Sequence, residues 1–245
     1  MLDNSHSAFS PPNTNLTLWR YMDLTKLLSL LENRRLFFAR ADMFDDPYEG
    51  TWSKAGVKKL RAQVAAGTIP LTSATVDGLL ASSESMRQKT FISCWFASEH
   101  ESAAMWELYA SSKGVAIMSD HDSLASAIQA APITGSTTMI SYVDYDKTPI
   151  SFKNTFFPFT HKRLSFEHEN ELRAIISSDG GINRQHIQAD ATSVVIDINP
   201  EYLIKKIFVS PRADQWFSEL VEQIVNRYSL PIPVVKSNLY DRPIY

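Results

Sequence analysis

The stretch FEHENELR (residues 166–173) leads into an apolar run, and together they predict a strand over Leu172–Ser177. Because side chains at i and i+2 of a strand project from the same face, we expect Glu169, Glu171 and Arg173 to stand in one row. Two neighbouring carboxylates repel, so one holds its proton more tightly, which suits acid–base chemistry or stabilisation of a developing cation. The alternative is a solvated edge whose surface charges pair with Arg173.

Other strands and helices follow one another without the regular β-α-β alternation of a doubly wound sheet. Residues 67–88 are rich in Ser and Thr with weak periodicity, which predicts a surface loop with a short helix. The pattern as a whole favours a mixed α+β architecture. The predicted strands are Leu16–Tyr21, Leu36–Ala41, Thr90–Phe96, Gly114–Met118, Thr138–Tyr145, Leu172–Ser177, Ser193–Ile198, Ile207–Ser210 and Pro233–Asn238. The predicted helices run from Asp23 to Asn33, up to about Ala66, around Met105, Trp106 and Tyr109, and over Ala213–Arg227.

Composition indicates one globular domain. The chain has 245 residues, of which 44% are hydrophobic, enough for a proper core. Residues 1–15 are polar with a Pro-Pro pair and are predicted to be a disordered tail, which leaves residues 16–245 for the domain. The net charge of −3 supplies no overall attraction to nucleic acid or anionic lipid. With one cysteine, no signal-peptide pattern and no apolar run of about 20 residues, the protein is expected to be cytoplasmic.

Several common chemistries lack their motif. No Gly-rich phosphate loop is present, the histidines lack metal-site spacing, and Cys94 lies in an apolar strand with no histidine beside it. Asp45, Asp46 and Glu49 could hold a divalent cation, and with the Glu pair they would suit a metal-dependent nuclease. A turn before Pro47, followed by a helix N-terminus, explains the same acidic residues without a metal.

Two polar side chains lie within predicted strands. Arg20 is expected to point to the face opposite Trp19 and Tyr21, where its charge requires a carboxylate of the protein or a bound phosphate. Ser93 lies in the strand Thr90–Phe96, where a hydroxyl either satisfies a backbone group or belongs to a site. Neither residue decides a function alone.

The order of these residues resembles a known class of enzymes. An arginine on the first strand, a serine on a middle strand and an E-x-E pair at the head of a later strand form the arrangement of the arginine-serine-glutamate ADP-ribosyltransferases. From about Leu16 to near the C-terminus, the chain also resembles the bacterial domain-of-unknown-function family 2971. This resemblance implies an ADP-ribosyltransferase-like fold, a split mixed β-sheet core with flanking helices. It is carried in order by LWRYMDLTKLLSLLENRRLFFARADMFDDPYEG, FISCWF, MWELYASSKGVAIMSD and FEHENELR.

The resemblance assigns a role to each polar residue. It implies that Arg20 contacts the NAD diphosphate, that Ser93 holds the catalytic carboxylate in place, and that Glu171 is this carboxylate. An ionised Glu171, hydrogen-bonded to the ribose 2′-hydroxyl, would stabilise the positive charge that develops on the sugar as nicotinamide leaves. Glu169 would then deprotonate the incoming nucleophile. The residues expected to bind NAD are Arg20, Tyr21, Trp95, Tyr109 and Arg173.

The chain departs from the transferase pattern in its flanking residues. The serine segment commonly reads Ser-Thr-Ser but is Ser-Cys-Trp here, Phe166 stands where the family often has Trp, and little motif surrounds Arg20. Other basic residues are therefore alternative diphosphate contacts, and the aromatic residues are either a stacking wall or part of the core. The basic alternatives are Arg40, Lys162, Arg163 and Arg173, and the aromatic residues are Trp95, Phe96 and Tyr109.

The resemblance implies an intracellular enzyme that cleaves the nicotinamide–ribose bond of NAD without a metal and transfers ADP-ribose to a protein or nucleic acid. Such bacterial domains are often toxins or antiphage effectors, so an antitoxin or another partner protein is expected as well. Two alternatives stay open. One is an NAD glycohydrolase with water as acceptor, and the other is a non-catalytic module that binds a nucleotide, nucleic acid or partner protein, in which Glu171 only pairs with Arg173.

Overall fold

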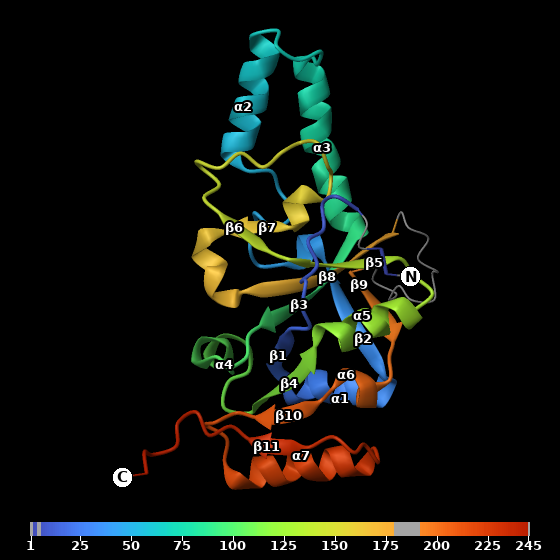
Figure 1. The fold of residues 1–245 in the computed structure, drawn as a ribbon, viewed down its shortest axis with the longest axis vertical. Coiled ribbons are helices and arrows are strands. Elements are labelled where there is room, and N and C mark those ends of the chain that lie inside the picture. Colours follow the sequence, from blue (N-terminus) through green and yellow to red (C-terminus); the bar gives the residue numbers. More distant parts are fainter. Residues whose placement is uncertain (1, 4–5, 179–191, 245) are drawn as a thin grey trace. The chain divides into compact units, whose positions relative to one another are not determined.

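The computed structural model describes residues 2–3, 6–178 and 192–244. The chain forms two compact units and passes between them several times. Unit 1 consists of residues 1–11, 38–93 and 132–194, and unit 2 consists of residues 12–37, 94–131 and 195–245. Helices and a mixed β-sheet confirm the predicted α+β class (Figure 1). Three strands have residues in both units: β2 (Arg35–Arg40), β3 (Thr90–Ala97) and β9 (Ser193–Asp197).

Unit 2 contains a mixed sheet in the order β11-β10-β4-β1, followed by the C-terminal half of β3. Its pairings are antiparallel except for the parallel pair β10 and β11. In β1, Trp19 and Tyr21 lie on one face because side chains alternate along a strand, and their rings stack 6.3 Å apart. The strands are β1 (Thr17–Asp23), β4 (Gly114–Asp120), β10 (Lys206–Val209) and β11 (Val234–Lys236).

The helices of unit 2 begin at polar caps. An oxygen of Asp23 accepts a hydrogen bond from the Lys26 N–H at 2.9 Å, which starts α1 as the sequence predicted. Asp120 caps α5 in the same way through the Ser123 N–H at 2.7 Å, although the sequence reasoning did not predict this helix. The helices are α1 (Leu24–Asn33), α4 (Ala103–Tyr109), α5 (His121–Ala130), α6 (Pro200–Leu203) and α7 (Gln215–Arg227).

Unit 1 is built on β8, which pairs with both β5 and β3. The N-terminal half of β3 also pairs with β2, through Ala39 opposite Ile92. A separate parallel pair, β6 and β7, aligns Tyr142 with Lys162. The strands are β5 (Gly135–Met139), β6 (Ser141–Val143), β7 (His161–Arg163) and β8 (Glu171–Ser177), and the 3-10 helices are η1 (Ala41–Met43), η2 (Phe157–Phe159) and η3 (Leu164–Glu169).

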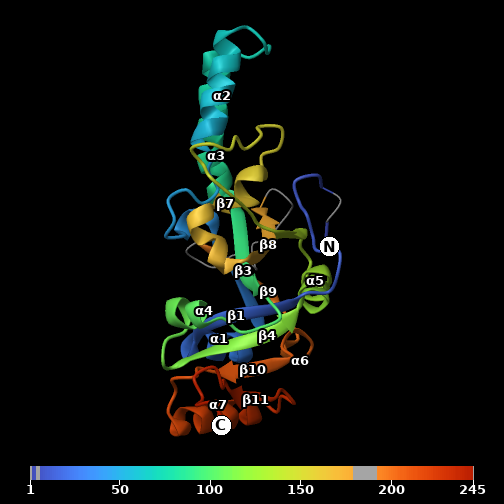
Figure 2. The same ribbon diagram turned by 60° about the vertical axis from the view of Figure 1, so that its left-hand side comes forward.

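A helical hairpin extends from unit 1. Helices α2 (Lys54–Ala65) and α3 (Ser73–Lys89) lie side by side and project beyond the strands of this unit, as Figure 1 and Figure 2 show. The prediction of a surface loop with a short helix over residues 67–88 was therefore wrong, because α3 has 17 residues. Because only Val76 of α3 is buried, the helix needs no apolar stripe, and its sequence shows no helical period of apolar residues. Within the described residues, no helix combines the length and apolarity needed to cross a membrane.

The described part of residues 1–11 contacts β5, while the disorder predicted for residues 1–15 stays a prediction. The Asp3 N–H donates to the Gly135 carbonyl at 2.8 Å, and the Met139 N–H donates to the Ser10 carbonyl at 3.0 Å. A strand edge offers backbone groups that need partners, and this polar segment supplies them. Its composition alone could not reveal that pairing.

Candidate functional site

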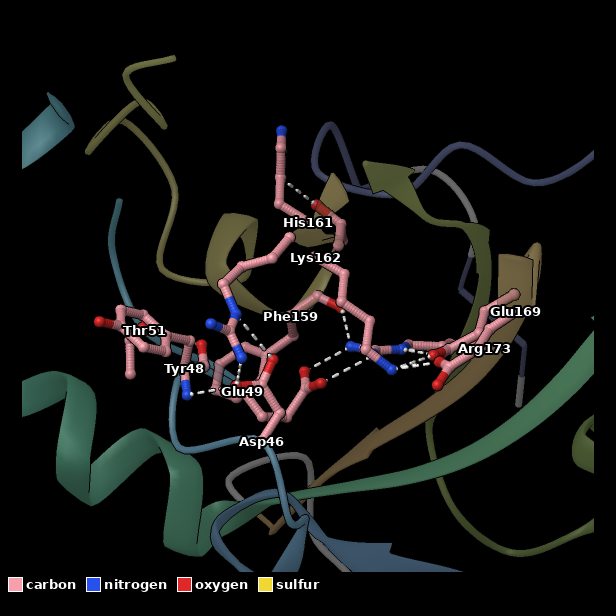
Figure 3. Close-up of polar contacts among 12 residues, drawn as sticks. Asp46, Tyr48, Glu49, Thr51, Phe159, His161, Lys162, Glu169 and Arg173 are labelled. Atoms are coloured by element: carbon pink, nitrogen blue, oxygen red, sulfur yellow. Dashed lines mark hydrogen bonds and ion pairs between the residues drawn. The ribbon is translucent and has the colours of Figure 1, made fainter. Parts of the chain in front are cut away.

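Unit 1 encloses a group of charged side chains that we call the ionic cluster (Figure 3). The cluster contains three carboxylates and two cations, and each residue has at most 7% of its surface exposed. Charged residues are rarely buried to this extent unless they are paired. The members are Glu49, Lys162, Glu169, Glu171 and Arg173.

The strand β8 and the preceding turn bring the two glutamates of the E-x-E motif into the cluster. Glu171 and Arg173 share a face of β8, as predicted from their spacing. Glu169 does not belong to this row, because it ends the 3-10 helix η3 and Asn170 follows with a left-handed φ of 34°. Asparagine tolerates this conformation better than most residues, and it breaks the extended path. The prediction of a three-residue row was therefore wrong for Glu169.

Arg173 is the centre of the cluster and has no exposed surface. Its Nη1 and Nη2 donate to the two oxygens of Glu49 at 2.6 and 2.8 Å, and its Nε donates to Oε2 of Glu171 at 2.6 Å. Nη1 also donates to the Phe159 carbonyl at 3.0 Å. A guanidinium with five donors in a planar fork fits this set of acceptors, whereas an ammonium would not. Arg173 was predicted to bind NAD, as an alternative contact for its diphosphate. Its guanidinium nitrogens donate to these protein groups, and its contact with NAD stays a prediction.

A tight turn places Glu49 against Arg173. Asp46 accepts a hydrogen bond from the Tyr48 N–H at 3.0 Å, and Gly50 has a left-handed φ of 68°. A side chain at Gly50 would bring its Cβ to 2.5 Å from the Phe159 ring, so the turn requires glycine there. The acidic turn thus closes onto the residue whose carbonyl also binds Arg173.

Lys162 joins the two glutamates. From β7, its Nζ donates to Oε1 of Glu171 at 2.6 Å and also to Oε2 of Glu169. The neighbouring strand β6 contributes Tyr142, whose hydroxyl oxygen accepts the Glu171 N–H at 2.8 Å. Both carboxylate oxygens of Glu171 and its backbone N–H therefore have partners within unit 1.

The cluster drives the pKa values of the two glutamates apart. Burial opposes ionisation of Glu171, but the charges of Arg173 and Lys162 and the hydrogen bonds it accepts hold its pKa well below its usual range. Burial raises the pKa of Glu169 to about 7, with a further contribution from its hydrogen bond to Glu171 and the repulsion between them. With three carboxylates and two cations the fully ionised cluster carries a charge of −1, so a single proton on Glu169 makes it neutral. Near neutral pH the pair thus combines a fixed anion with a group that can exchange a proton.

Two of the three acidic residues of the turn that were considered as metal ligands are paired with arginines. Asp46 binds Arg163, with 2.7 Å between Oδ1 and Nη2, and Glu49 binds Arg173, while Asp45 is exposed. Among the residues that the structure describes, no group of three or more His, Cys, Asp or Glu side chains has the geometry to hold a metal ion.

Arg20 lies in unit 2. It occupies the face of β1 opposite Trp19 and Tyr21, as predicted, with its guanidinium carbon 5.6 Å from the centre of the Trp95 ring. Its Nη2 also donates to the Phe37 carbonyl at 3.2 Å. Burial lowers the pKa of Arg20 to about 10. Its predicted contact with a diphosphate stays a prediction.

The remaining predicted residues lie in strands or near the end of a helix. Ser93 lies in β3 within unit 1 and is buried. In unit 2, Trp95 is fully buried, and Tyr21 is buried with its hydroxyl accepting the Ser102 N–H at 2.8 Å. Both side chains belong to the buried core, an alternative that the sequence analysis left open for Trp95 but not for Tyr21. Tyr109, at the end of α4, is 46% exposed.

Sequence reasoning offered the pair of Glu171 and Arg173 as an alternative, and the structure contains it, but Glu49 and Lys162 were missed as the other partners in the cluster. Glu49 was considered only as a metal ligand and Lys162 only as an alternative diphosphate contact. One signal was available, because Arg173 precedes the apolar run Ala174–Ile176 and a buried arginine requires carboxylates. The partners themselves could not be chosen from local spacing, since Glu49 lies 124 residues before Arg173.

Comparisons with known proteins do not add to this picture. No protein-family model, curated protein sequence or solved structure gives a significant match to this chain.

Proposed function

We propose that this chain is an ADP-ribosyltransferase-like enzyme that cleaves the nicotinamide–ribose bond of NAD and transfers ADP-ribose to a macromolecular acceptor. The observation that supports this most is the pair Glu169 and Glu171, which Lys162 bridges and whose pKa values move in opposite directions. Two carboxylates separated in this way are suited to different roles in one reaction. The resemblance to the arginine-serine-glutamate transferases supplies the substrate.

In the proposed reaction, the bond between ribose C1′ and the nicotinamide nitrogen breaks, and its electron pair leaves with nicotinamide. The sugar then carries positive charge, which the anionic Glu171 stabilises without having to change its own protonation. Glu169, with a pKa of about 7, accepts the proton of the nucleophile that attacks C1′. With a protein or nucleic-acid acceptor the product is an ADP-ribosylated macromolecule, and with water it is free ADP-ribose.

A second candidate is a non-catalytic module of the same fold that binds a nucleotide or a partner. The engagement of Glu171 favours it, because Lys162 and Arg173 take one oxygen each and only 4% of the residue is exposed. In this case the ionic cluster holds unit 1 together and performs no chemistry. The two candidates differ in whether nicotinamide is released.

The test is to incubate the purified protein and a cell lysate with NAD labelled in the adenosine part, and to follow both nicotinamide release and the position of the label. We expect Glu171→Gln to slow nicotinamide release by about 100-fold or more, because it keeps the shape and removes the charge. Glu49→Gln is the matched control, since it also removes a buried charge beside Arg173 but has no role in the reaction. Thermal unfolding of both variants shows whether they fold.

The outcomes separate the alternatives. Label on a macromolecule supports transfer, and free ADP-ribose alone supports hydrolysis by the same site. Equal losses in folded Glu171→Gln and Glu49→Gln protein contradict the role of Glu171. Intact NAD with the wild-type protein overturns the enzymatic proposal and supports the binding module.

A further inference from the structure

An exposed tyrosine lies on the turn that supplies Glu49 to the ionic cluster. Tyr48 has 45% of its surface exposed. The acidic residues on either side of the Pro47-Tyr48 pair, Asp46 and Glu49, are both buried. The edge-to-face contact with Tyr145, at 6.0 Å between ring centres, fixes one side of its ring. An exposed aromatic ring held in place in this way is available to a ligand.

Arg163 covers the Tyr48 ring. Its guanidinium carbon lies 4.4 Å from the ring centre, which is within the range of a cation–π contact. Asp46 holds the guanidinium with two hydrogen bonds, from Nη2 at 2.7 Å and from Nε at 3.3 Å. The side chain of Asp46 is buried and that of Arg163 is one-third exposed, so the arginine is anchored on its inner side. Tyr48 and Arg163 therefore form a cation–π pair that Asp46 anchors and that reaches the surface.

Phe166 connects this pair to the two glutamates. Its ring centre lies 5.3 Å from the Arg163 guanidinium carbon and 4.7 Å from Nζ of Lys162, the same nitrogen that bridges Glu169 and Glu171. An unbroken series of contacts thus leads from the exposed Tyr48 to the carboxylate pair, entirely within unit 1. Figure 3 shows Tyr48, Asp46, Glu49 and Lys162 around the same site.

We propose that the Tyr48–Arg163 pair is a stacking platform for a planar heteroaromatic ring of the NAD substrate. The inference rests on the proposed function and adds a binding residue that the resemblance does not assign. Aromatic side chains stack on bases without needing a particular hydrogen-bond pattern, and the positive charge of Arg163 adds attraction for a nucleotide. The predicted aromatic binders Tyr21 and Trp95 are buried in unit 2, whereas Tyr48 is exposed in unit 1, on the turn that carries Glu49.

The experiment measures NAD binding by calorimetry and NAD cleavage by nicotinamide release for three variants. We expect Tyr48→Ala to weaken NAD binding about tenfold and to raise KM with little change in kcat, because stacking acts equally on bound substrate and transition state. Tyr48→Phe should bind like the wild type. Tyr240→Ala is the matched control, since Tyr240 is 46% exposed and also carries an arginine, Arg212, at 5.1 Å, but lies in unit 2.

Separate titrations with nicotinamide mononucleotide and with ADP-ribose identify the ring. The ligand whose affinity falls in Tyr48→Ala carries the ring that stacks there. If the wild type cleaves NAD and Tyr48→Ala leaves both binding and KM unchanged, the platform is overturned and the proposed function stands. If the wild type binds NAD through Tyr48 without cleaving it, the platform stands and the enzymatic proposal fails. No binding and no cleavage by the wild type overturns both.

Discussion

The interiors of the two units differ in what fills them. Unit 1 buries the ionic cluster, in which Arg173 and Lys162 pair with three glutamates. Unit 2 instead buries an aromatic layer in which Trp19, Tyr21 and Trp106 pack together, with Tyr21 and Trp106 edge to face at 5.0 Å. Both layers lie beside strands, so strand formation does not decide between them.

The difference shows what each interior can contribute. Apolar burial stabilises a fold in proportion to the area removed from water, and it does so at any pH. A buried ion-pair cluster must first overcome the desolvation of each charge, so it is often no more stable than a well-packed apolar core. We therefore interpret the ionic cluster as a feature kept for chemistry or specificity, and the aromatic layer as the stabilising core.

Removing the central cation should break unit 1 most strongly. We expect Arg173→Ala to lower the free energy of unfolding by about 3–5 kcal/mol, because Glu49 and Glu171 would remain buried without their arginine. Arg212→Ala in unit 2 is the control, since its pair with Glu107 is exposed and should contribute little to stability. Urea denaturation measures both. Similar small losses of unfolding free energy in the two variants would show that the cluster contributes little to stability and that its glutamates remain buried without Arg173.

The stability of unit 1 should depend on pH through Glu169. Its carboxyl has a pKa near 4.5 when unfolded and about 7 when folded, so between these values the folded state holds a proton that the unfolded state has released. The stabilisation from this proton is complete below about pH 4.5 and is lost as the pH rises through 7. The pKa of Glu171 moves in the opposite direction, so its own contribution changes only below about pH 4.5.

The measurement compares wild type with Glu169→Gln by urea denaturation from pH 4.5 to 8. We expect the wild type to lose stability relative to the variant over this range, because glutamine has no proton to release. The control is Ile117→Ala, at a buried position in the sheet of unit 2. It should lower the free energy of unfolding by about 2–5 kcal/mol, and by the same amount at every pH. If the difference in unfolding free energy between wild type and Glu169→Gln is the same at every pH, the raised pKa of Glu169 is contradicted. If the difference between wild type and Ile117→Ala changes with pH, the distinction between the two interiors is contradicted.

The sequence predicted the parts of the fold that have a strong local period. The strands β1, β3 and β4 and the helices α1 and α7 lie within a few residues of their predicted positions, since their apolar residues recur every second or at helical spacing. Helix α5 was missed because its buried apolar residues, Leu124 and Ile128, are too few to show a helical period. Helix α3 was missed because it is largely exposed.

Prediction of the site stopped where long-range pairing begins. The spacing of Glu171 and Arg173 correctly placed both on one face of β8, because this relation is local. The left-handed turn at Asn170, which brings Glu169 back to Lys162, has no periodic signal. The approach of Glu49 to Arg173 depends on the packing of segments 124 residues apart, which one sequence without its structure does not specify.

The smallest expected effect concerns the hairpin that extends from unit 1. Gly78 lies in α3, is exposed, and has nothing within 4 Å of the position of an added Cβ. Gly78→Ala should therefore stabilise α3 by about 0.5–1 kcal/mol, since alanine restricts the unfolded chain and favours the helix. Hydrogen exchange of the α3 amides measures this gain even where the hairpin opens independently of the rest of the unit.

Gly50→Ala is the opposing control, because Gly50 has a left-handed φ of 68° and an added Cβ would meet the Phe159 ring. We expect it to destabilise the turn that supplies Glu49, and with it the ionic cluster. Faster exchange in α3 of Gly78→Ala would contradict the expected stabilisation. If the α3 amides of Gly78→Ala exchange more slowly while NAD binding and cleavage stay constant, the stability of the hairpin does not affect the proposed site. This is the expected result, because the groups proposed to react lie in the charged interior of unit 1.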